Sequence, residues 1–324
     1  MIMEKQLLEE VKARALKGIP ATIDEALALD AICTTDELCD VANEVRIKHC
    51  GNKIDTCSIV NARSGRCTED CKWCAQAARH STGIDEYDII PDDQLMEAVK
   101  LNASQGVHRF SMVTSGRKIS PADVRRFCDM YRRVAAASPM KLCASMGLLT
   151  KDELASLREA GVQRYHCNLE TAESFFGTLC TTHSHADKLR TIRAAREVGM
   201  EVCSGGIIGM GETMRQRLEL AEQAREAGAM SIPVNVLQPI KGTPLEGTPL
   251  IGEDEVVRSV ALMKLVAPLA ILRFAGGRAR LSHKSMLRML HGGISGAIVG
   301  DMLTTIGNKM VDDHTLFAMA GFEE

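Results

Sequence analysis

Residues 57–76 read CSIVNARSGRCTEDCKWCAQ, a short run of β-branched and apolar residues followed by a loop with three cysteines. The run over residues 57–61 is typical of a buried strand, because β-branched side chains pack well on a pleated surface. Gly65 follows, and then the thiols Cys67, Cys71 and Cys74 in the spacing C-x3-C-x2-C. A strand that is followed directly by a group of thiols indicates an α/β protein whose functional site lies at the carboxyl ends of its strands.

Seven further runs of this kind recur along the chain, and segments with helical periodicity lie between most of them. Helix signals are clear at Ser120, which precedes Pro121 and a helix over 122–137, and at Thr150, which forms a capping box with Glu153. Eight strands separated by helices predict a (β/α)8 TIM barrel, which needs about 250 residues. An open doubly wound sheet is the alternative that the alternation leaves open. The seven further runs cover residues 109–113, 141–145, 164–169, 201–206, 231–237, 269–274 and 294–299.

The domain organisation follows from where this alternation begins. Residues 1–50 are predicted to form an N-terminal helical extension, and residues 51–324 the barrel with a C-terminal tail. The first 18 residues are charged throughout and lack the apolar core of a secretory signal, so a cytoplasmic location is expected. The most apolar later stretch, over 260–275, is interrupted by Lys264, Pro268 and Arg273, which argues against a membrane span.

Composition excludes several classes of function. Among 324 residues, 45% are hydrophobic and 25% charged, which excludes a disordered chain. The net charge is −3 and no segment concentrates Lys and Arg, which argues against nucleic-acid or anionic-membrane partners. Twelve cysteines without a secretory signal favour metal ligation or catalysis over a disulfide framework.

The cysteine triad predicts an iron–sulfur centre with an open position. Structural zinc sites usually take four protein ligands, commonly from paired C-x2-C units, and no second pair follows here. A ferredoxin site would supply a fourth cysteine at a characteristic spacing, and none lies nearby. Three thiolates on one loop can each bind one iron of a cubane and leave the fourth iron for an exogenous ligand. Three incidental buried cysteines are the structural alternative.

The triad after the first strand resembles the motif of the radical S-adenosylmethionine (SAM) superfamily. Over nearly the whole chain the sequence resembles one family within it, the biotin synthases, in order and spacing of motifs. The segments that carry this resemblance are CSIVNARSGRCTEDCKWCAQ (57–76), RYHCNLETAESFFG (164–177), VCSGGIIGMGE (202–212), SIPVNVLQPIKGTPL (231–245) and LRFAGGR (272–278).

The resemblance implies a 4Fe-4S cluster on Cys67, Cys71 and Cys74, with SAM on its open iron. It places Trp73 against the adenine. Backbone near Ser115 would meet the methionine part of SAM, and Asn168 and Glu170 would bind ribose hydroxyls and a ureido ring. Asn235 would pair with the same ureido group, because an amide complements both N–H and C=O groups. Three glycines would let backbone approach the adenine closely, namely Gly205, Gly206 and Gly209.

The activity implied is that of a sulfurtransferase of biotin biosynthesis, which inserts sulfur into dethiobiotin. The resemblance also implies a one-electron reductant such as flavodoxin or ferredoxin, and a homodimer. Two alternatives stay open on the residues. One is another radical SAM barrel enzyme, of the hydrogenase-maturation or methylornithine-synthase type, and the other is a non-catalytic iron–sulfur electron carrier or redox sensor.

The sequence departs from the family at the sulfur source. In the family a second, two-iron cluster deep in the barrel is held by three cysteines and an arginine; Cys143, Cys203 and Arg273 match that set, but Ser111 stands where the family has cysteine. Cys167 replaces a histidine of the family motif, and Cys180 follows. We therefore hypothesise that Cys143, Cys167 and Cys203 hold an auxiliary cluster of altered type, such as a larger four-iron cluster. Strict alternation sends Cys167 and Asn168 to opposite faces, so this hypothesis needs a bulge or strand end there. Packing roles are expected for Cys33, Cys39, Cys50, Cys57 and Cys128.

Overall fold

The computed structural model of the chain describes residues 2–303, 307 and 310–323. Its strands form one parallel sheet in the order β5-β4-β3-β2-β1-β9-β8-β7-β6, and β5 also pairs with β7 through Cys203 and Ser231. The sheet is therefore closed, which confirms the predicted (β/α)8 barrel and rules out the open doubly wound sheet. The strands are β1 (Asp55–Arg63), β2 (Arg109–Thr114), β3 (Lys141–Ser145), β4 (Val162–His166), β5 (Glu201–Cys203), β6 (Gly206–Ile208), β7 (Ser231–Val236), β8 (Ile271–Phe274) and β9 (Ile294–Ile298).

The fifth strand of the barrel is split into two short pieces. β5 ends at Cys203, and β6 begins at Gly206 after the chain steps across Ser204 and Gly205. A Cβ on Gly205 would lie 2.1 Å from the carbonyl oxygen of Pro233, so only glycine allows β7 to approach this closely. The prediction of one continuous strand over 201–206 missed this step, because alternation alone does not show a lateral shift.

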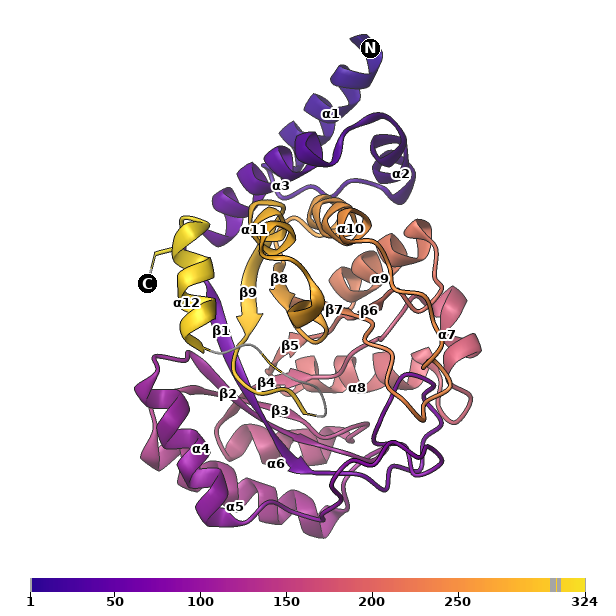
Figure 1. Cartoon of the computed structure of the whole chain (residues 1–324). Coiled ribbons are helices and arrows are strands. Elements are labelled where there is room, and N and C mark those ends of the chain that lie inside the picture. The colour runs from indigo at the N-terminus through magenta and orange to yellow at the C-terminus, as the bar shows by residue number, and fades with distance from the viewer. Residues whose placement is uncertain (1, 304–306, 308–309, 324) are drawn as a thin grey trace.

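The helices surround the barrel, with α1, α2 and α3 placed beyond α10 and α11 at one side (Figure 1). Polar caps set most of their beginnings: α6 starts after the capping box of Thr150 and Glu153, and α5 after Ser120 and Pro121, as predicted. The helices are α1 (Ile2–Ala15), α2 (Ile23–Ile32), α3 (Thr35–Cys50), α4 (Asp92–Ser104), α5 (Pro121–Ala137), α6 (Lys151–Glu159), α7 (Glu173–Leu179), α8 (His185–Glu197), α9 (Met214–Glu226), α10 (Glu253–Val266), α11 (His283–His291) and α12 (Met310–Met319), with a 3₁₀ turn at Arg278–Arg280.

The apolar stretch noted in the sequence is a buried helix. α10 packs against α3 on one side and α9 on the other, so nearly all of its second half is buried. Lys264 within it is fully buried, and its ammonium donates to the carbonyl of Ala270 at 2.8 Å and to Cys50 Sγ at 3.3 Å. Among the described helices, none is long and apolar enough to cross a membrane.

Candidate active site

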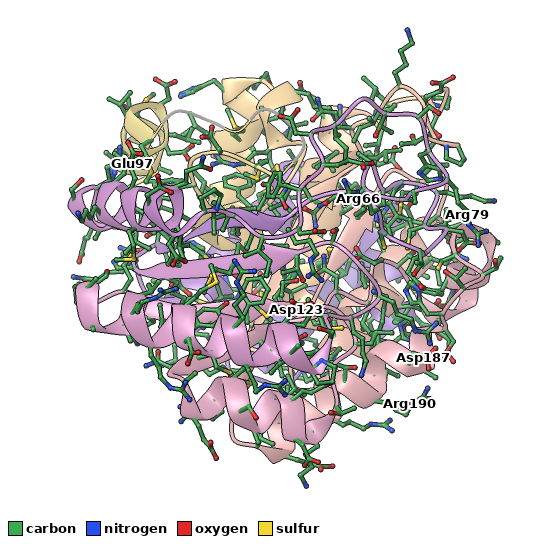
Figure 2. The ribbon with its side chains drawn as sticks, turned by 90° about the horizontal axis from the view of Figure 1, so that it is seen from below. Arg66, Arg79, Glu97, Asp123, Asp187 and Arg190 are labelled. Atoms are coloured by element: carbon green, nitrogen blue, oxygen red, sulfur yellow. The ribbon has the colours of Figure 1, made fainter. Side chains whose placement is uncertain are left out.

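The loop that follows β1 carries the cysteine triad to the carboxyl ends of the strands. The backbone N–H of Cys67 donates to Gln76 O at 3.0 Å, and Cys67 O accepts from Ala78 N at 2.8 Å, so this part of the loop is tied to itself. Its tip reaches α7, where Lys72 N donates to Leu179 O at 3.0 Å (Figure 1). Figure 2 shows this loop, with Arg66 and Arg79 on it, at the same end of the molecule as Asp187 and Arg190 of α8.

The KGTPL segment supports this loop from behind. Gly242 has a φ of +86°, and a Cβ at this position would lie 2.1 Å from the carbonyl oxygen of Ser81. A side chain at this position would clash with the backbone of Ser81, so any other residue would push the cysteine loop away from the KGTPL segment. The motif that carried much of the resemblance thus packs closely against the cysteine loop.

All three cysteines of the triad line one cavity of about 250 Å³ at the mouth of the barrel. Burial raises the pKa of Cys67, and it raises the pKa of Cys74 to about 11. The pKa of Cys71 is also raised, first by a hydrogen bond with the thiol of Cys180 and then by burial. Three thiols that face one cavity fit the donor set of an iron–sulfur cluster, which binds them as thiolates and releases their protons.

Most of the predicted cofactor and substrate residues surround the same mouth. Ser115, Asn168 and Glu170 line this cavity with the triad, and Trp73 lies on its rim. A second cavity of about 260 Å³ adjoins it, sharing Trp73, Asn168 and Glu170 and adding Asn235. The structure thus brings these five side chains together around two adjoining cavities, although they come from four separate segments of the chain.

Both asparagines also connect barrel segments. Asn235 donates from Nδ2 to Gly206 O at 2.9 Å, and its Oδ1 accepts from Gly276 N at 2.9 Å. Asn168 Oδ1 accepts from Gly205 N at 3.1 Å, and its Nδ2 donates to Glu170 at 3.3 Å. Each amide therefore keeps only part of its hydrogen-bonding capacity for a ligand.

Glu170 has a strained backbone and a buried cation beside it. Its φ is +73°, in the left-handed region that non-glycine residues rarely adopt and that is often found at functional sites. Lys188 of α8 lies 3.9 Å from Glu170 Oε1. Burial opposes the charge on Lys188, but the surrounding negative groups, Glu170 first, outweigh it and raise the pKa of Lys188. Lys188 was not predicted from the sequence, because nothing in the spacing of α8 marks it as facing the cavity.

The three glycines predicted to contact the adenine are required by close packing within the protein itself. A Cβ on Gly206 would lie 2.2 Å from Glu170 O, and one on Gly209 would lie 2.9 Å from Ile251 Cγ2. Gly205 packs against Pro233 as described above, and none of the three is among the residues that line the two mouth cavities. Close approach of the chain to itself explains these glycines, and their contact with adenine stays a prediction.

A third, enclosed cavity of about 50 Å³ lies inside the barrel, below the mouth. Cys143 and Cys203 line it, with Arg273 and Ser111, as inward alternation along the strands predicts. Cys57 lines it too. Val113, Ser145 and His166 line both this cavity and the one that holds the triad, so the two adjoin along the barrel.

Cys57, expected to be a packing residue, is the third thiol of the inner cavity. It makes a hydrogen bond with Cys143, which with burial raises the pKa of Cys57; the same bond, followed by the charges of Arg164 and Arg109, lowers the pKa of Cys143. Burial opposes ionisation of Cys203, but a hydrogen bond with His166 and the nearby arginines outweigh it and lower its pKa to about 7. The sequence did contain an indication for Cys57. It lies two residues before Ile59 on β1, and residues two apart on a strand face the same side, here the inside of the barrel.

Cys167 is not among the residues that line this inner cavity. β4 ends at His166 and not at Leu169 as predicted, so His166 takes the last inward position and Cys167 follows the strand. Cys167 is buried and lines the mouth cavity, near Lys188 and Glu170. Its backbone N–H donates to Cys203 O at 3.1 Å, but its thiol does not line the inner cavity with Cys143 and Cys203.

Arg273 is held by the barrel itself. Its Nη1 donates to Asp55 O at 2.6 Å and to Ala297 O at 3.1 Å, its Nη2 to Asp55 Oδ2 at 2.7 Å, and its Nε to Ser231 Oγ at 3.1 Å. Only one of its five N–H groups is left, and the ion pair with Asp55 favours the charged guanidinium. This geometry fits a fixed positive charge beside the thiols better than a nitrogen ligand to iron.

A layer of charges closes the barrel below the inner thiols. Asp55 also pairs with Arg109 at 3.3 Å and Arg164 at 3.2 Å, and Arg164 reaches Glu201 at 2.9 Å. Burial opposes the charge on Asp55, but Arg273, Arg109 and Arg164 outweigh it and lower its pKa to about 2. Three guanidinium groups face two carboxylates, so one positive charge remains to favour an anionic centre above them.

Comparisons with known proteins agree with this arrangement. Residues 62–224 match the Radical SAM superfamily domain, and residues 233–323 match the Biotin and Thiamin Synthesis associated domain. The fold is also that of solved enzymes of distant sequence. Methylornithine synthase superposes with a TM-score of 0.80 at 18% identity, over 97% of this chain and 96% of that one. A hydrogenase maturase from Carboxydothermus hydrogenoformans gives 0.81 at 14% identity, over 98% of this chain and 79% of that one.

Curated relatives are far closer in sequence than these structures. Biotin synthase of Parabacteroides distasonis is 46% identical over 97% of this chain and 96% of its own length. That of Porphyromonas gingivalis is 46% identical over 98% and 96%, and that of one Clostridium botulinum strain is 45% identical over 96% and 98%. The matches are full-length and the two thiol-lined cavities lie where the motifs predicted chemistry, so the chain belongs to the biotin synthase family of the radical SAM superfamily.

Proposed function

We propose that the chain converts dethiobiotin to biotin by radical SAM chemistry, with a sulfur atom supplied from inside the barrel. The observation that carries this proposal is the pair of adjoining thiol-lined cavities. One holds Cys67, Cys71 and Cys74 at the mouth, and the other holds Cys57, Cys143 and Cys203 below it. A reaction that breaks C–H bonds and forms C–S bonds needs a radical source and a sulfur source within reach of one substrate, and this stacking supplies both positions.

At the mouth, Cys67, Cys71 and Cys74 would hold three irons of a cubane. When bound, this cluster with SAM supplies a 5′-deoxyadenosyl radical that removes hydrogen from carbon. Trp73 offers an aromatic face on the rim for the adenine, and Glu170 and Asn168 offer acceptors for ribose hydroxyls. Lys188 places a positive charge in the same cavity, which suits the carboxylate of SAM.

The substrate would lie in the second mouth cavity, which adjoins the triad cavity and shares Ile59 and Ile298 with the inner cavity. Asn235 and Asn168 line the same cavity from either side of the split strand β5/β6 and have amide groups that match a ureido ring. The apolar wall at this level, formed by Ile59, Ile207 and Ile298, suits a hydrocarbon chain and excludes water from a radical.

For the sulfur source we propose Cys57, Cys143 and Cys203 as the thiolate ligands of an auxiliary iron–sulfur cluster. All three are at most 9% exposed, and Cys57 and Cys143 already form a hydrogen bond. The number and placement of thiolates set the type of cluster, so a third ligand on β1 in place of β2 favours a cluster that differs from the family's two-iron type. Arg273 would add its fixed charge, and His166 its hydrogen bond to Cys203.

Single-turnover assays on anaerobically reconstituted protein test the proposal. Dethiobiotin should accelerate the formation of 5′-deoxyadenosine from SAM, and biotin should appear with iron lost from the auxiliary site. A protein that cleaves SAM but responds to another small molecule, and not to dethiobiotin, would be a different radical SAM enzyme. A protein that holds iron but never cleaves SAM would be an electron carrier.

A further inference from the structure

A second group of metal-binding side chains lies beside the triad, and only one member of the triad belongs to it. Cys71 Sγ lies 3.7 Å from Cys180 Sγ, and Cys180 Sγ lies 3.3 Å from His183 Nδ1 and 4.0 Å from His183 Nε2. One ligand atom from each of the three residues falls within 4.8 Å of the other two.

The separation of 3.7 Å between the two thiols matches the spacing of ligands around a tetrahedral ion, and the two distances from Cys180 to the His183 ring nitrogens, 3.3 and 4.0 Å, lie on either side of it. Metal–sulfur bonds of about 2.3 Å and metal–nitrogen bonds of about 2.0 Å place neighbouring ligands roughly 3.5–3.8 Å apart. In a cubane, by contrast, each thiolate binds a different iron, so the cluster itself keeps its thiolates well apart. The close pair Cys71 and Cys180 is therefore suited to a single ion and not to two corners of a cluster.

The two loops are held in this arrangement by bonds that do not involve the thiols. Asp70, next to Cys71, accepts from Thr181 N at 2.9 Å and from Thr182 N at 3.2 Å. Together with the Lys72–Leu179 backbone bond, these contacts fix the segment between α7 and α8 against the tip of the cysteine loop. The position of Cys180 relative to Cys71 is built into the fold.

An independent feature that points to a metal is the carboxylate behind His183. Glu69 Oε2 lies 2.5 Å from His183 Nδ1, and both side chains are more than nine-tenths buried. Metal-binding histidines commonly donate one ring N–H to such a carboxylate, which fixes the tautomer and leaves the other nitrogen free. With Nδ1–H donated to Glu69, the ring nitrogen left for a metal is His183 Nε2, which lies 4.0 Å from Cys180 Sγ, slightly farther than Nδ1 at 3.3 Å.

We propose that Cys71, Cys180 and His183 bind a single divalent transition-metal ion, of the Fe²⁺ or Zn²⁺ class, in the protein that does not hold its radical cluster. Thiolate and imidazole ligands suit these ions, and a fourth position stays open for water. With Cys71 as a terminal ligand of each centre, and on the proposed function, the single ion and the cubane exclude each other, so release of the ion precedes cluster assembly.

The binding test uses Co²⁺ as a spectroscopic probe on cluster-free, fully reduced protein. A Cys57→Ala/Cys143→Ala background removes two thiols of the inner cavity, which would bind the probe themselves. One equivalent of Co²⁺ should give thiolate-to-cobalt charge-transfer bands and tetrahedral d–d bands. Cys180→Ala and His183→Gln should weaken binding by at least about a hundredfold, and Glu69→Gln by roughly ten- to a hundredfold.

The matched controls are Cys67→Ala and Cys74→Ala. Each removes a predicted ligand of the radical cluster but none of the single-ion site, so each should bind Co²⁺ as tightly as the background protein. The proposal is overturned if affinity follows Cys67 and Cys74 and not Cys180 and His183, or if no thiolate bands appear. Circular dichroism on every variant separates loss of a ligand from loss of the fold.

Competition with the cluster gives the second readout, in the otherwise wild-type chain. Zn²⁺ at about ten times its dissociation constant leaves roughly one site in ten free, so reconstitution of the radical cluster should slow about tenfold. In Cys180→Ala, which keeps Cys67, Cys71 and Cys74, the same Zn²⁺ should have little effect on that rate. Equal slowing in both proteins would contradict the proposal. Failure to form a cluster even without Zn²⁺ would instead count against the proposed function.

Discussion

The thiols at the mouth of the barrel come from one loop between residues 67 and 74, whereas the inner thiols come from three strands and span residues 57 to 203. The mouth thiols are positioned by local turns and by loops that pack on them, so their spacing in the sequence reflects their arrangement in space. The inner thiols are positioned by strand register alone: Cys143 lies beside Arg164 on β4, Cys57 beside Arg109 on β2, and Cys203 beside Ser231 on β7. A motif search finds the first kind of site, and only a closed barrel shows the second.

The largest effect is expected at the mouth. Cys71→Ala should abolish SAM cleavage, because a cubane held by two thiolates loses the arrangement that leaves one iron open. The measurement is 5′-deoxyadenosine formed per reconstituted protein. Cys128→Ala is the control, since this buried cysteine of α5 lies away from both sites and should leave cleavage intact. Near wild-type cleavage by Cys71→Ala would exclude the radical SAM mechanism.

The next effect separates the two sites and decides between two cysteines. Cys57→Ala should lose auxiliary iron and stop biotin formation, yet still cleave SAM through the intact triad. Cys167→Ala should keep its iron and form biotin, because its thiol does not line the inner cavity. Iron and sulfide analysis with Mössbauer spectra measures this directly. The reverse result, with iron lost from Cys167→Ala and kept in Cys57→Ala, would restore the ligand set first expected from the sequence.

These two cysteines show how far the sequence alone leads. All eight barrel strands, the triad, and the inward positions of Cys143, Cys203 and Arg273 could be predicted, because they rest on alternation and spacing. That the thiol of Cys167 does not line the inner cavity could not be predicted, because it depends on β4 ending at His166, one residue before the thiol. Strand ends are set by hydrogen bonds to neighbours, here Cys167 N to Cys203 O, and those neighbours are distant in sequence. For the same reason, the positions of Lys188 and of the Cys180–His183 pair beside the triad could not be predicted, because their neighbours are also distant in sequence.

A moderate effect is expected in the second mouth cavity, which contains no inner thiol and is lined by Asn235. Asn235→Ala should weaken binding of dethiobiotin by roughly ten- to a hundredfold, since a lost buried hydrogen bond costs on the order of 1–3 kcal/mol. The concentration of dethiobiotin that half-maximally stimulates 5′-deoxyadenosine formation measures it, and Asn168→Ala should behave similarly. Because Asn235 also links Gly206 to Gly276, SAM binding is the control. If SAM binding falls by the same factor, the asparagine acts only by shaping the barrel mouth.

A smaller effect concerns the charged layer below the inner thiols. The pKa of Asp55 is lowered from 3.8 to about 2, which corresponds to roughly 2 kcal/mol of stability for the ionised group. This stabilisation is fully present above about pH 4 and is lost as the pH falls through about 2. Urea unfolding of cluster-free protein at several pH values should therefore show a steeper acid loss for wild type than for Asp55→Asn. Parallel curves would mean that the pKa of Asp55 is the same in the folded and the unfolded chain.

The smallest effect is expected from Ser111→Cys, which asks whether the inner site depends on the strand or on the number of thiols. Ser111 is buried in the inner cavity, and its backbone lies beside Cys143. Exchange of its oxygen for sulfur adds little volume, so stability should change by less than about 1.5 kcal/mol. In the wild-type background the three existing thiols should keep the auxiliary iron count unchanged.

In a Cys57→Ala background, however, Ser111→Cys restores three thiols in the arrangement typical of the family. It should recover auxiliary iron as a two-iron centre, visible as a change in the Mössbauer spectrum. Recovery of the original spectrum would show that the cluster type is set by the cavity, and not by which strand supplies the third thiol.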